Sequence, residues 1–204
     1  MLSFHILLVA IASLLALCQS SPSLPLDPIC QTLGRSSRDP AFQNNVYLRK
    51  RDQMCHIQIQ GGGTALYTYA LNKISVPIVV NAMAYVTSLN LDKGSTISPS
   101  GSVYAISLGG VNAVAGSILS SKLGGNGNEP ANLVPTSQVA IAKWNAVDLA
   151  VYNCLRSGQS GTAKLRWVFS YQTTRDTSPY KVMYFVSFVG GPNNCEKIVE
   201  SIDI

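Results

Sequence analysis

"VAIAKWNAVDLAVYNCLRSG", residues 139–158, is the stretch that decides the fold. Apolar residues recur in it at intervals of three and four, the spacing of one face of an α-helix. These residues are Ile141, Trp144, Val147, Val151 and Leu155. Gly158 follows as a helix stop. The stretch therefore predicts one main helix over residues 139–155, with its apolar face packed against the rest of the protein.

Segments typical of β-strands flank this helix on both sides. They alternate apolar with polar residues or are rich in β-branched and aromatic residues. The expected strands are "CHIQIQ" (55–60), "TALYTYALN" (64–72), "VPIVVNAMAYVTSLNL" (76–91), "GSVYAISL" (101–108), "AKLRWVFSYQ" (163–172) and "YKVMYFVSFVGG" (180–191). A helix is the alternative for the Ala-Met part of the segment 76–91. Strands, one main helix and then strands predict the α+β class with an antiparallel sheet.

The chain begins with a segment typical of a secretory signal peptide. The apolar run 6–17 is too short to span a bilayer and ends in small polar residues, which places cleavage near Ser20 or Ser21. Residues 1–20 are therefore expected to be a signal peptide, with a buried N-terminal helix as the alternative. We expect a secreted, extracellular protein without a membrane anchor, because no other stretch is long and apolar enough for a membrane helix.

The remaining chain divides by composition into two parts. Residues 21–53 are rich in Pro, Ser and Arg and predict an irregular segment. Lys50-Arg51 is either an exposed basic turn or a dibasic processing site, and cleavage there would make the segment a propeptide. Residues 54–204 have the length of one ordinary domain.

Four cysteines remain after the signal peptide: Cys30, Cys55, Cys154 and Cys195. An even number in an exported chain predicts two disulfides. Three pairings are open, and nearness in sequence favours Cys30–Cys55 and Cys154–Cys195. A zinc site is disfavoured, because no two of these cysteines are close together and only one His follows the signal peptide.

The charge balance permits attraction to phosphate or to acidic surfaces. The chain carries 15 Lys and Arg against 10 Asp and Glu, a net charge of +5. Small secreted proteins are often basic, and only 12% of the residues are charged. Charge alone therefore names no partner.

A long glycine-rich loop, "SLGGVNAVAGSILSSKLGGNGNEPANLVP", precedes the main helix, and loops of this length are usually functional. Asn132 offers an amide oxygen at its end, and Asp148 lies on the helix four residues after Trp144, on the same face. Together these oxygens would suit Mg²⁺ or Mn²⁺. The alternative is an Asn that caps a turn and an Asp on a solvated helix face.

The segment 115–148 resembles the DNA/RNA non-specific endonuclease family, the ββα-metal nucleases. That family carries a short Ala-Gly-His or Asp-x-Gly-His step, then Gly-Gly-x-Gly and Asn-Leu-Val-Pro, and then a helix with Trp-x-x-x-Glu. "AGSILSSKLGGNGNEPANLVP" and "WNAVD" follow the same order at nearly the same spacing. Residues 163–190 fit the family loosely, and the first hundred residues hardly match.

The resemblance implies that the supporting residues are kept while the catalytic ones are lost. The family's Asn and helix acid correspond to Asn132 and Asp148. The His that activates water corresponds to Ser117, and a serine hydroxyl takes no proton at neutral pH without its own base. The metal-binding Asn corresponds to Ala140 or Ile141, depending on the anchor, and both are apolar.

Replacements for the lost groups are also conceivable. His56 could act as the base if its strand lies beside the site, although a satisfied structural His is the more ordinary role. Gln138 and Asn145 could offer a metal an oxygen.

Basic and aromatic side chains lie in or near the same half of the chain. The basic residues expected to bind nucleic acid are Lys122, Lys143, Arg156, Lys164 and Arg166, provided that they share one face. The aromatic residues that could stack bases are Tyr152, Trp167, Tyr171 and Tyr184. Strand alternation favours core packing for these aromatic residues instead.

These observations predict a secreted nuclease-like protein, inactive or weak as an enzyme, that binds nucleic acid or a protein partner. A secreted effector or toxin-like factor is a natural setting for such a scaffold. Two alternatives remain: an active metal-dependent endonuclease with a rearranged site, which would need Mg²⁺ or Mn²⁺, and an interaction or structural protein whose similarity is chance.

Overall fold

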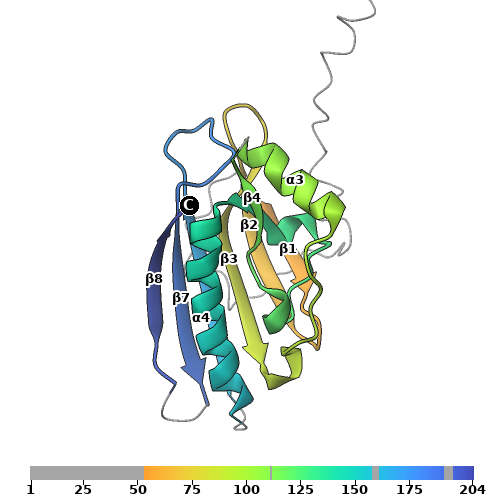
Figure 1. The fold of residues 1–204 in the computed structure, drawn as a ribbon, viewed down its shortest axis with the longest axis vertical. Helices are drawn as coiled ribbons and strands as arrows, with labels where there is room; N and C mark the ends of the chain where they lie inside the picture. Colours follow the sequence, from red (N-terminus) through yellow and green to blue (C-terminus); the bar gives the residue numbers. More distant parts are fainter. Residues whose placement is uncertain (1–52, 111, 158–160, 191–194) are drawn as a thin grey trace, which may run out of the picture.

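The chain forms a large antiparallel sheet with helices on one side of it (Figure 1). The computed structural model describes residues 53–110, 112–157, 161–190 and 195–204. The strands of the large sheet are β1 (Gln53–Gln58), β2 (Thr64–Leu71), β3 (Pro77–Thr87), β6 (Thr162–Ser170), β7 (Lys181–Val189) and β8 (Ile198–Asp203). Their spatial order is β1-β2-β3-β6-β7-β8, and every neighbouring pair is antiparallel.

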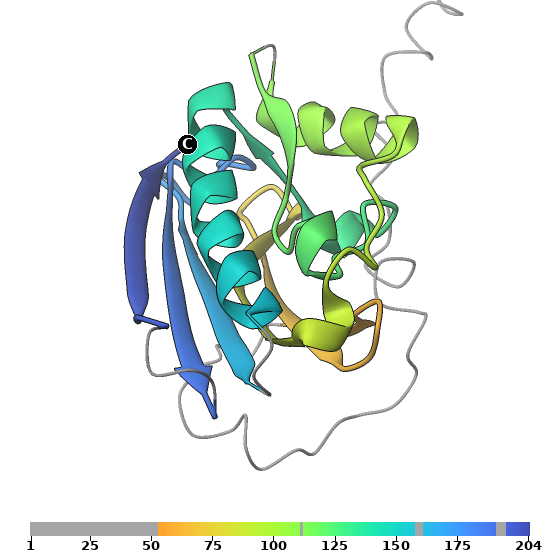
Figure 2. The same ribbon diagram turned by 60° about the horizontal axis from the view of Figure 1, so that its bottom comes forward.

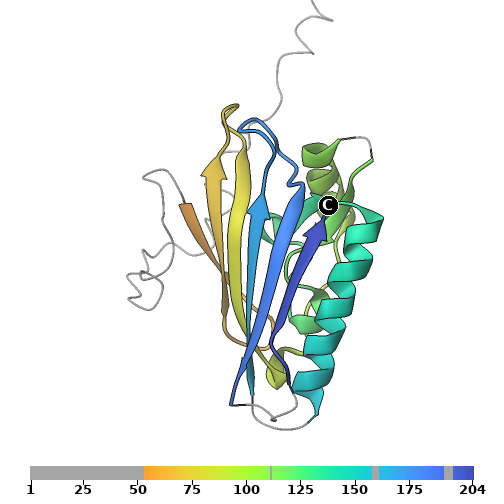
Figure 3. The ribbon, with the colours of Figure 1, turned by 90° about the vertical axis from the view of Figure 1, so that its left-hand side faces the viewer.

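The remaining elements form one insertion between β3 and β6, which are neighbours in the sheet. They are η3 (Ser88–Asn90), α3 (Pro99–Gly109), β4 (Val114–Ser117), η4 (Ser121–Leu123), η5 (Pro130–Asn132), β5 (Leu133–Thr136) and α4 (Gln138–Arg156). Because the insertion leaves and rejoins adjacent strands, it lies against a single face of the sheet (Figure 2). The opposite face carries none of the helices of the described residues (Figure 3).

Side-chain alternation divides the central strands between these two faces. In β6, residues Ala163, Leu165, Trp167 and Phe169 are buried, while the residues between them are only partly buried. The ring of Trp144 on α4 lies 6.2 Å from those of both Phe169 and Tyr184. The buried residues therefore face α4 and form the core with its apolar stripe.

The main helix and five of the six expected strands are confirmed. The side chain of Ser137 accepts a hydrogen bond from the Ala140 N–H and begins α4. Trp144, Val147, Val151 and Leu155 are buried as the periodicity predicts. Trp167 and Tyr184 lie in the core, 4.9 Å apart between ring centroids, in agreement with core packing.

The prediction of a strand at residues 101–108 is wrong, because this segment lies within helix α3. Ser98 accepts a hydrogen bond from the Gly101 N–H, and Pro99 occupies the first helical turn. A capping Ser followed by Pro is a helix-start signal that outweighs the β-branched composition of the segment. The described residues thus contain a second α-helix beside the one main helix that was expected.

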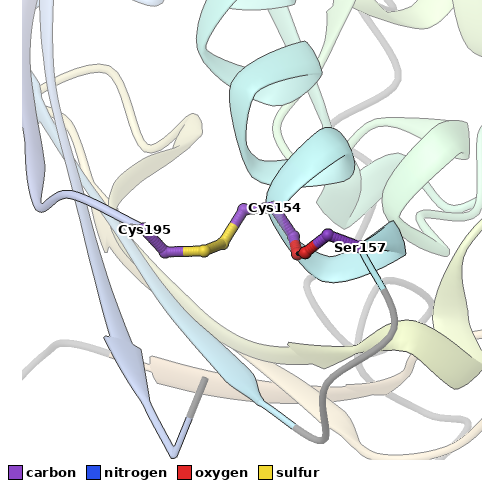
Figure 4. The surroundings of a disulfide bond; sticks show 3 residues. All are labelled: Cys154, Ser157 and Cys195. Carbon is purple, nitrogen blue, oxygen red and sulfur yellow. Dashed lines mark hydrogen bonds between the residues drawn. A yellow bond between two sulfur atoms is a disulfide. The ribbon is translucent and has the colours of Figure 1, made fainter. Parts of the chain in front are cut away.

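The predicted disulfide Cys154–Cys195 is present, with its Cα atoms 5.8 Å apart (Figure 4). It joins the last turn of α4 to the segment that precedes β8. Cys55 is also disulfide-bonded. Cys30, its expected partner, lies outside the described residues, as do the signal peptide, the segment 21–52 and the dibasic step.

In the part of the chain that the structure describes, no helix has the length and apolarity needed to cross a membrane.

Candidate functional site

The site region is a β-β-α unit built from consecutive elements. Strands β4 and β5 pair antiparallel, with Ser117 opposite Leu133 and Gly116 opposite Val134. Helix α4 begins directly after β5, with only Ser137 between the two elements (Figure 2). The strand carrying Ser117 and the first turns of α4 are thereby held side by side.

Asn132 is a buried structural support at the end of the long loop. Its Oδ1 accepts hydrogen bonds from the Tyr67 hydroxyl and the Leu119 N–H, each at 2.8 Å. Its Nδ2 donates to the carbonyl oxygens of Leu119 at 2.9 Å and Asn126 at 3.2 Å. Because every hydrogen bond that this amide needs comes from protein groups, Asn132 has no free oxygen for a metal.

Asp148 is the buried acid of the site. Its side chain is 3% exposed, and its Oδ1 accepts a 2.8 Å hydrogen bond from the Tyr184 hydroxyl. Burial raises the pKa of Asp148 to about 6, while the hydrogen bond from Tyr184, the nearby Ser120 hydroxyl and the charge of Lys122 oppose the rise. Asn132 and Asp148 thus meet consecutive residues of one segment, Leu119 and Ser120.

Between β4, η4 and α4 lies a cleft of about 210 Å³, the α4 cleft. Its lining comprises Thr96, Ile97, Ala115, Gly116, Ser117, Ser120, Ser121, Ile141, Trp144 and Asn145. Ile141 lines the cleft, whereas Ala140 is fully buried beside it. Among the two apolar candidates for the family's metal-ligand position, Ile141 is therefore the one that faces this space.

Three buried polar atoms near this part of α4 have no hydrogen-bond partner in the described chain; two belong to residues that line the α4 cleft, and the third belongs to Asp148, four residues after Trp144. They are Oδ2 of Asp148, Oγ of Ser120 and Nε1 of Trp144. Such atoms usually meet water or a ligand, because a buried polar group without a partner costs about 1–3 kcal/mol. The cleft thus offers both acceptors and donors to a polar molecule.

A cluster of charged and aromatic residues adjoins the cleft, which we call the basic cluster: Lys122, Tyr152, Arg156 and Asp92. The Lys122 ammonium and the Arg156 guanidinium each lie 5.9 Å from the Tyr152 ring centroid. The Tyr152 hydroxyl donates a 2.5 Å hydrogen bond to Asp92, which raises the pKa of Tyr152. Residues 141, 145, 152 and 156 share one side of α4 by helical geometry, so the cleft and the cluster form one continuous surface.

The remaining basic residues do not join this surface. Lys143 is exposed on α4 but lies two residues from Ile141, on another side of the helix. Lys164 and Arg166 alternate with the buried residues of β6 and therefore project from the opposite face of the sheet. The five basic residues proposed from the sequence thus divide among separate surfaces.

The residues that could replace the lost base and metal ligand also lie in different places. His56 is on β1, opposite Leu66 in the register, and is not part of the cleft lining. Gln138 is exposed in the first turn of α4, while Asn145 lines the cleft. The described residues contain no group of three or more His, Cys, Asp or Glu placed to hold a metal.

The glycine-rich turn serves close backbone packing. A Cβ on Gly125 would lie 1.8 Å from the Leu119 carbonyl oxygen, and one on Gly127 would lie 2.2 Å from that of Thr96. These glycines bring the loop against its neighbours, and Leu119 and Ser120 are thereby held near Asn132 and Asp148.

Sequence reasoning missed Ser120 and Asp92 as members of the site. Ser120 stands three residues after Ser117, separated from it by two apolar residues, and no local pattern marked it. Asp92 is sixty residues from Tyr152 in the chain, and no local pattern links them.

No protein-family model matches the chain. No curated protein matches it significantly either.

Proposed function

We propose that this protein is an exported, nuclease-like scaffold that binds nucleic acid through the α4 cleft and the basic cluster without efficient cleavage. The observation that carries the proposal is the surface on one side of α4. There Lys122 and Arg156 flank an aromatic ring beside the cleft, and α4 itself carries the buried acid Asp148. The order β4, β5, α4 supports a relationship to the ββα-metal nucleases.

The chemistry of the cleft favours binding over catalysis. Ser117 stands where the family has its general base, and no basic side chain lines the cleft to activate it. Ile141, in the metal-ligand position, offers no oxygen or nitrogen. Asp148 has its Oδ1 engaged by Tyr184 and carries a raised pKa of about 6, so its remaining oxygen is a weak site for a cation.

The basic cluster has the character of a phosphate-binding surface. Lys122 and Arg156 are both exposed, and neither forms an ion pair with a carboxylate in the described chain. Their charges are therefore available to neighbouring phosphates of a nucleic-acid backbone. Tyr152 lies between them and offers an aromatic surface to a base or sugar.

The test is a binding titration with a labelled 20-base-pair DNA duplex in EDTA, followed by fluorescence anisotropy at several salt concentrations. The variant Lys122→Ala with Arg156→Ala should bind at least tenfold more weakly. The slope of log affinity against log salt should also fall by about 1.8 for two lost phosphate contacts. The charge-matched control Lys73→Ala with Lys143→Ala removes two exposed lysines elsewhere and should retain the slope.

Equal losses in the variant and the control would show that only net charge matters and would overturn a specific surface. Absence of measurable duplex affinity in the unmodified protein would overturn nucleic-acid binding by the α4 cleft and the basic cluster, which would favour a protein partner for this surface.

A second candidate, metal-dependent cleavage, is favoured by one observation. Asn145 lines the cleft with an amide oxygen, and Oδ2 of Asp148 has no partner. Together they could hold Mg²⁺ or Mn²⁺ in a rearranged site. Incubation of the oxidised protein with plasmid DNA and total RNA distinguishes the two functions. Digestion that is abolished by EDTA and by Asn145→Ala would favour the enzyme.

A further inference from the structure

One face of the large sheet is covered by no helix of the described chain (Figure 3). The centre of this face combines cations with aromatic rings. We call this centre the cation–aromatic face; its residues are Met83, Tyr85, Lys164, Arg166, Phe185 and Val199. The strand registers place them in two adjacent rows across the sheet. Tyr85 pairs with Lys164 in one row, while Met83, Arg166, Phe185 and Val199 follow one another in the next.

The two cations of this face lie over aromatic rings. The Lys164 ammonium is 5.8 Å from the Tyr85 ring centroid, and the Arg166 guanidinium is 6.0 Å from that of Phe185. The Arg166 Nε is buried and has no hydrogen-bond partner in the described chain. Both side chains are thereby held against the sheet.

Among the described residues, no carboxylate compensates the two cations of the face. On β3, β6, β7 and β8, the only acid that projects from this face is Asp203, which pairs with Lys181 at 3.9 Å. Lys164 and Arg166 have no carboxylate partner among the described residues. Two free cations without a nearby acid favour a polyanionic ligand.

Aromatic exposure points to a particular kind of polyanion. Tyr85 is 41% exposed and Val199 is 49% exposed, so the face presents an apolar surface beside its charges. In sheet geometry Tyr85 and Phe185 are roughly 12 Å apart, being two strands and two residues removed from each other. That distance suits bases of a single strand, whereas paired bases of a duplex are stacked on one another and cannot reach the rings.

We propose that the cation–aromatic face is a second nucleic-acid site, which binds single-stranded RNA or DNA by stacking unpaired bases and neutralising phosphates. It shares no residue with the α4 cleft or the basic cluster and lies on the other side of the sheet. The inference therefore does not depend on the first site, and either can fail alone.

The test uses the full oxidised protein carrying Lys122→Ala with Arg156→Ala, so that binding at the basic cluster is removed. A labelled 15-nucleotide oligo-U and a labelled duplex are titrated in EDTA. The oligo-U should bind, and binding should weaken about 5- to 150-fold on Tyr85→Leu or Phe185→Leu, the range for loss of one stacked base. Lys164→Ala with Arg166→Ala should lower the salt slope by about 1.4.

Matched controls separate this site from general charge and folding effects. Lys73→Ala with Arg175→Ala removes two exposed cations outside the face and should leave oligo-U binding unchanged. Photo-crosslinking with 4-thiouridine in the oligonucleotide should label peptides that contain Tyr85 or Phe185. Circular dichroism checks that each variant is folded. Crosslinking of the parent protein needs no substitution in the face, so it tests the site even if a face variant fails to fold.

Unchanged oligo-U binding in the face variants, or an equal loss of binding in the control variant, would overturn the inference. Crosslinks confined to α4 would also overturn it, as would affinity for anionic phospholipid vesicles without affinity for oligo-U. If the background variant has lost all oligo-U binding, the second site fails while the basic cluster stands. If that variant binds both ligands as tightly as the unmodified protein, the proposal for the basic cluster fails while this one stands.

Discussion

Asp148→Asn should stabilise the protein at neutral pH, by an amount that grows with pH. The substitution keeps an oxygen that can accept the hydrogen bond from Tyr184, and its new amide can donate to Ser120. It removes the negative charge that burial makes unfavourable. The change therefore isolates the cost of ionising one buried carboxyl group with little change in side-chain volume.

The raised pKa of Asp148 sets the expected magnitude and its sign. Burial raises this pKa from its usual 3.8 to about 6, so the unfolded chain ionises at lower pH than the folded one. The native protein thus loses stability as pH rises from about 4 to 6, and the full loss persists above pH 6. The gap between the two pKa values corresponds to roughly 3 kcal/mol. Of this, about 2–3 kcal/mol should develop between pH 4 and 7.5.

Urea unfolding followed by tryptophan fluorescence at pH 4 and pH 7.5 measures this effect. Both tryptophans are buried, Trp144 at 3% and Trp167 at 1% exposure, so unfolding changes their surroundings. The difference in unfolding free energy between Asp148→Asn and the unmodified protein should increase by about 2–3 kcal/mol between the two pH values.

Asp176→Asn is the control with the opposite sign. Hydrogen bonds from Thr173 lower the pKa of Asp176, so its contribution is present at neutral pH and is lost as pH falls. The stability deficit of this variant should therefore change little between pH 7.5 and pH 4 and shrink only as pH falls below about 4. An identical difference between Asp148→Asn and the unmodified protein at both pH values would refute the argument, because the pKa of Asp148 could not then be raised by burial.

Three further outcomes are expected. Asn132→Ala should lower the free energy of unfolding by about 3–5 kcal/mol in urea titrations, because the buried partners of Asn132 lose their hydrogen bonds. A loss of less than about 1 kcal/mol would contradict the role of Asn132 as a structural support. Replacing Cys154 and Cys195 by Ser should lower the free energy of unfolding by roughly 4 kcal/mol, because the disulfide closes a separation of 41 residues. Equal melting temperatures of the oxidised and the reduced parent protein would argue against this. Ser117→His with Ile141→Asn should raise Mg²⁺-dependent plasmid cleavage above that of the unmodified protein, since a general base alone typically increases the rate about 10²–10⁴-fold. A double variant that folds but has no activity would speak against the proposed relationship to the nucleases.

Local interactions made much of the fold predictable from the sequence. The three- and four-residue spacing from Trp144 to Leu155 specified α4, because one turn of helix brings such residues onto one side. Alternation in residues 163–170 likewise specified β6, since successive strand residues point to opposite faces. The pairing of Cys154 with Cys195 followed from nearness along the chain.

Local composition misled at residues 101–108. The β-branched and aromatic residues of "GSVYAISL" favoured a strand, yet Ser98 and Pro99 start a helix just before them. Short apolar segments are ambiguous in this way, because capping and packing can outweigh the intrinsic preferences of the residues.

The candidate site was predictable only in part. The order of motifs from Ser117 to Asp148 predicted a site in this segment, and Ser117 and Asn145 line a cleft there. Spacing alone could not decide whether Ala140 or Ile141 corresponds to the metal-binding Asn of the nucleases. The packing of α4 decided between them, because it buries Ala140 and turns Ile141 toward the cleft.

The sequence by itself determined the segments with local periodicity, the helix α4 and the alternating strands, because neighbouring residues alone set those patterns. Only the tertiary structure decided which charges share a surface. Lys122 meets Tyr152 across a thirty-residue separation, while Lys164 and Arg166, nearer to α4 in sequence, point away from it. The physical reason is the insertion between β3 and β6, which covers one face of the sheet and leaves alternate residues of the same strand on the other.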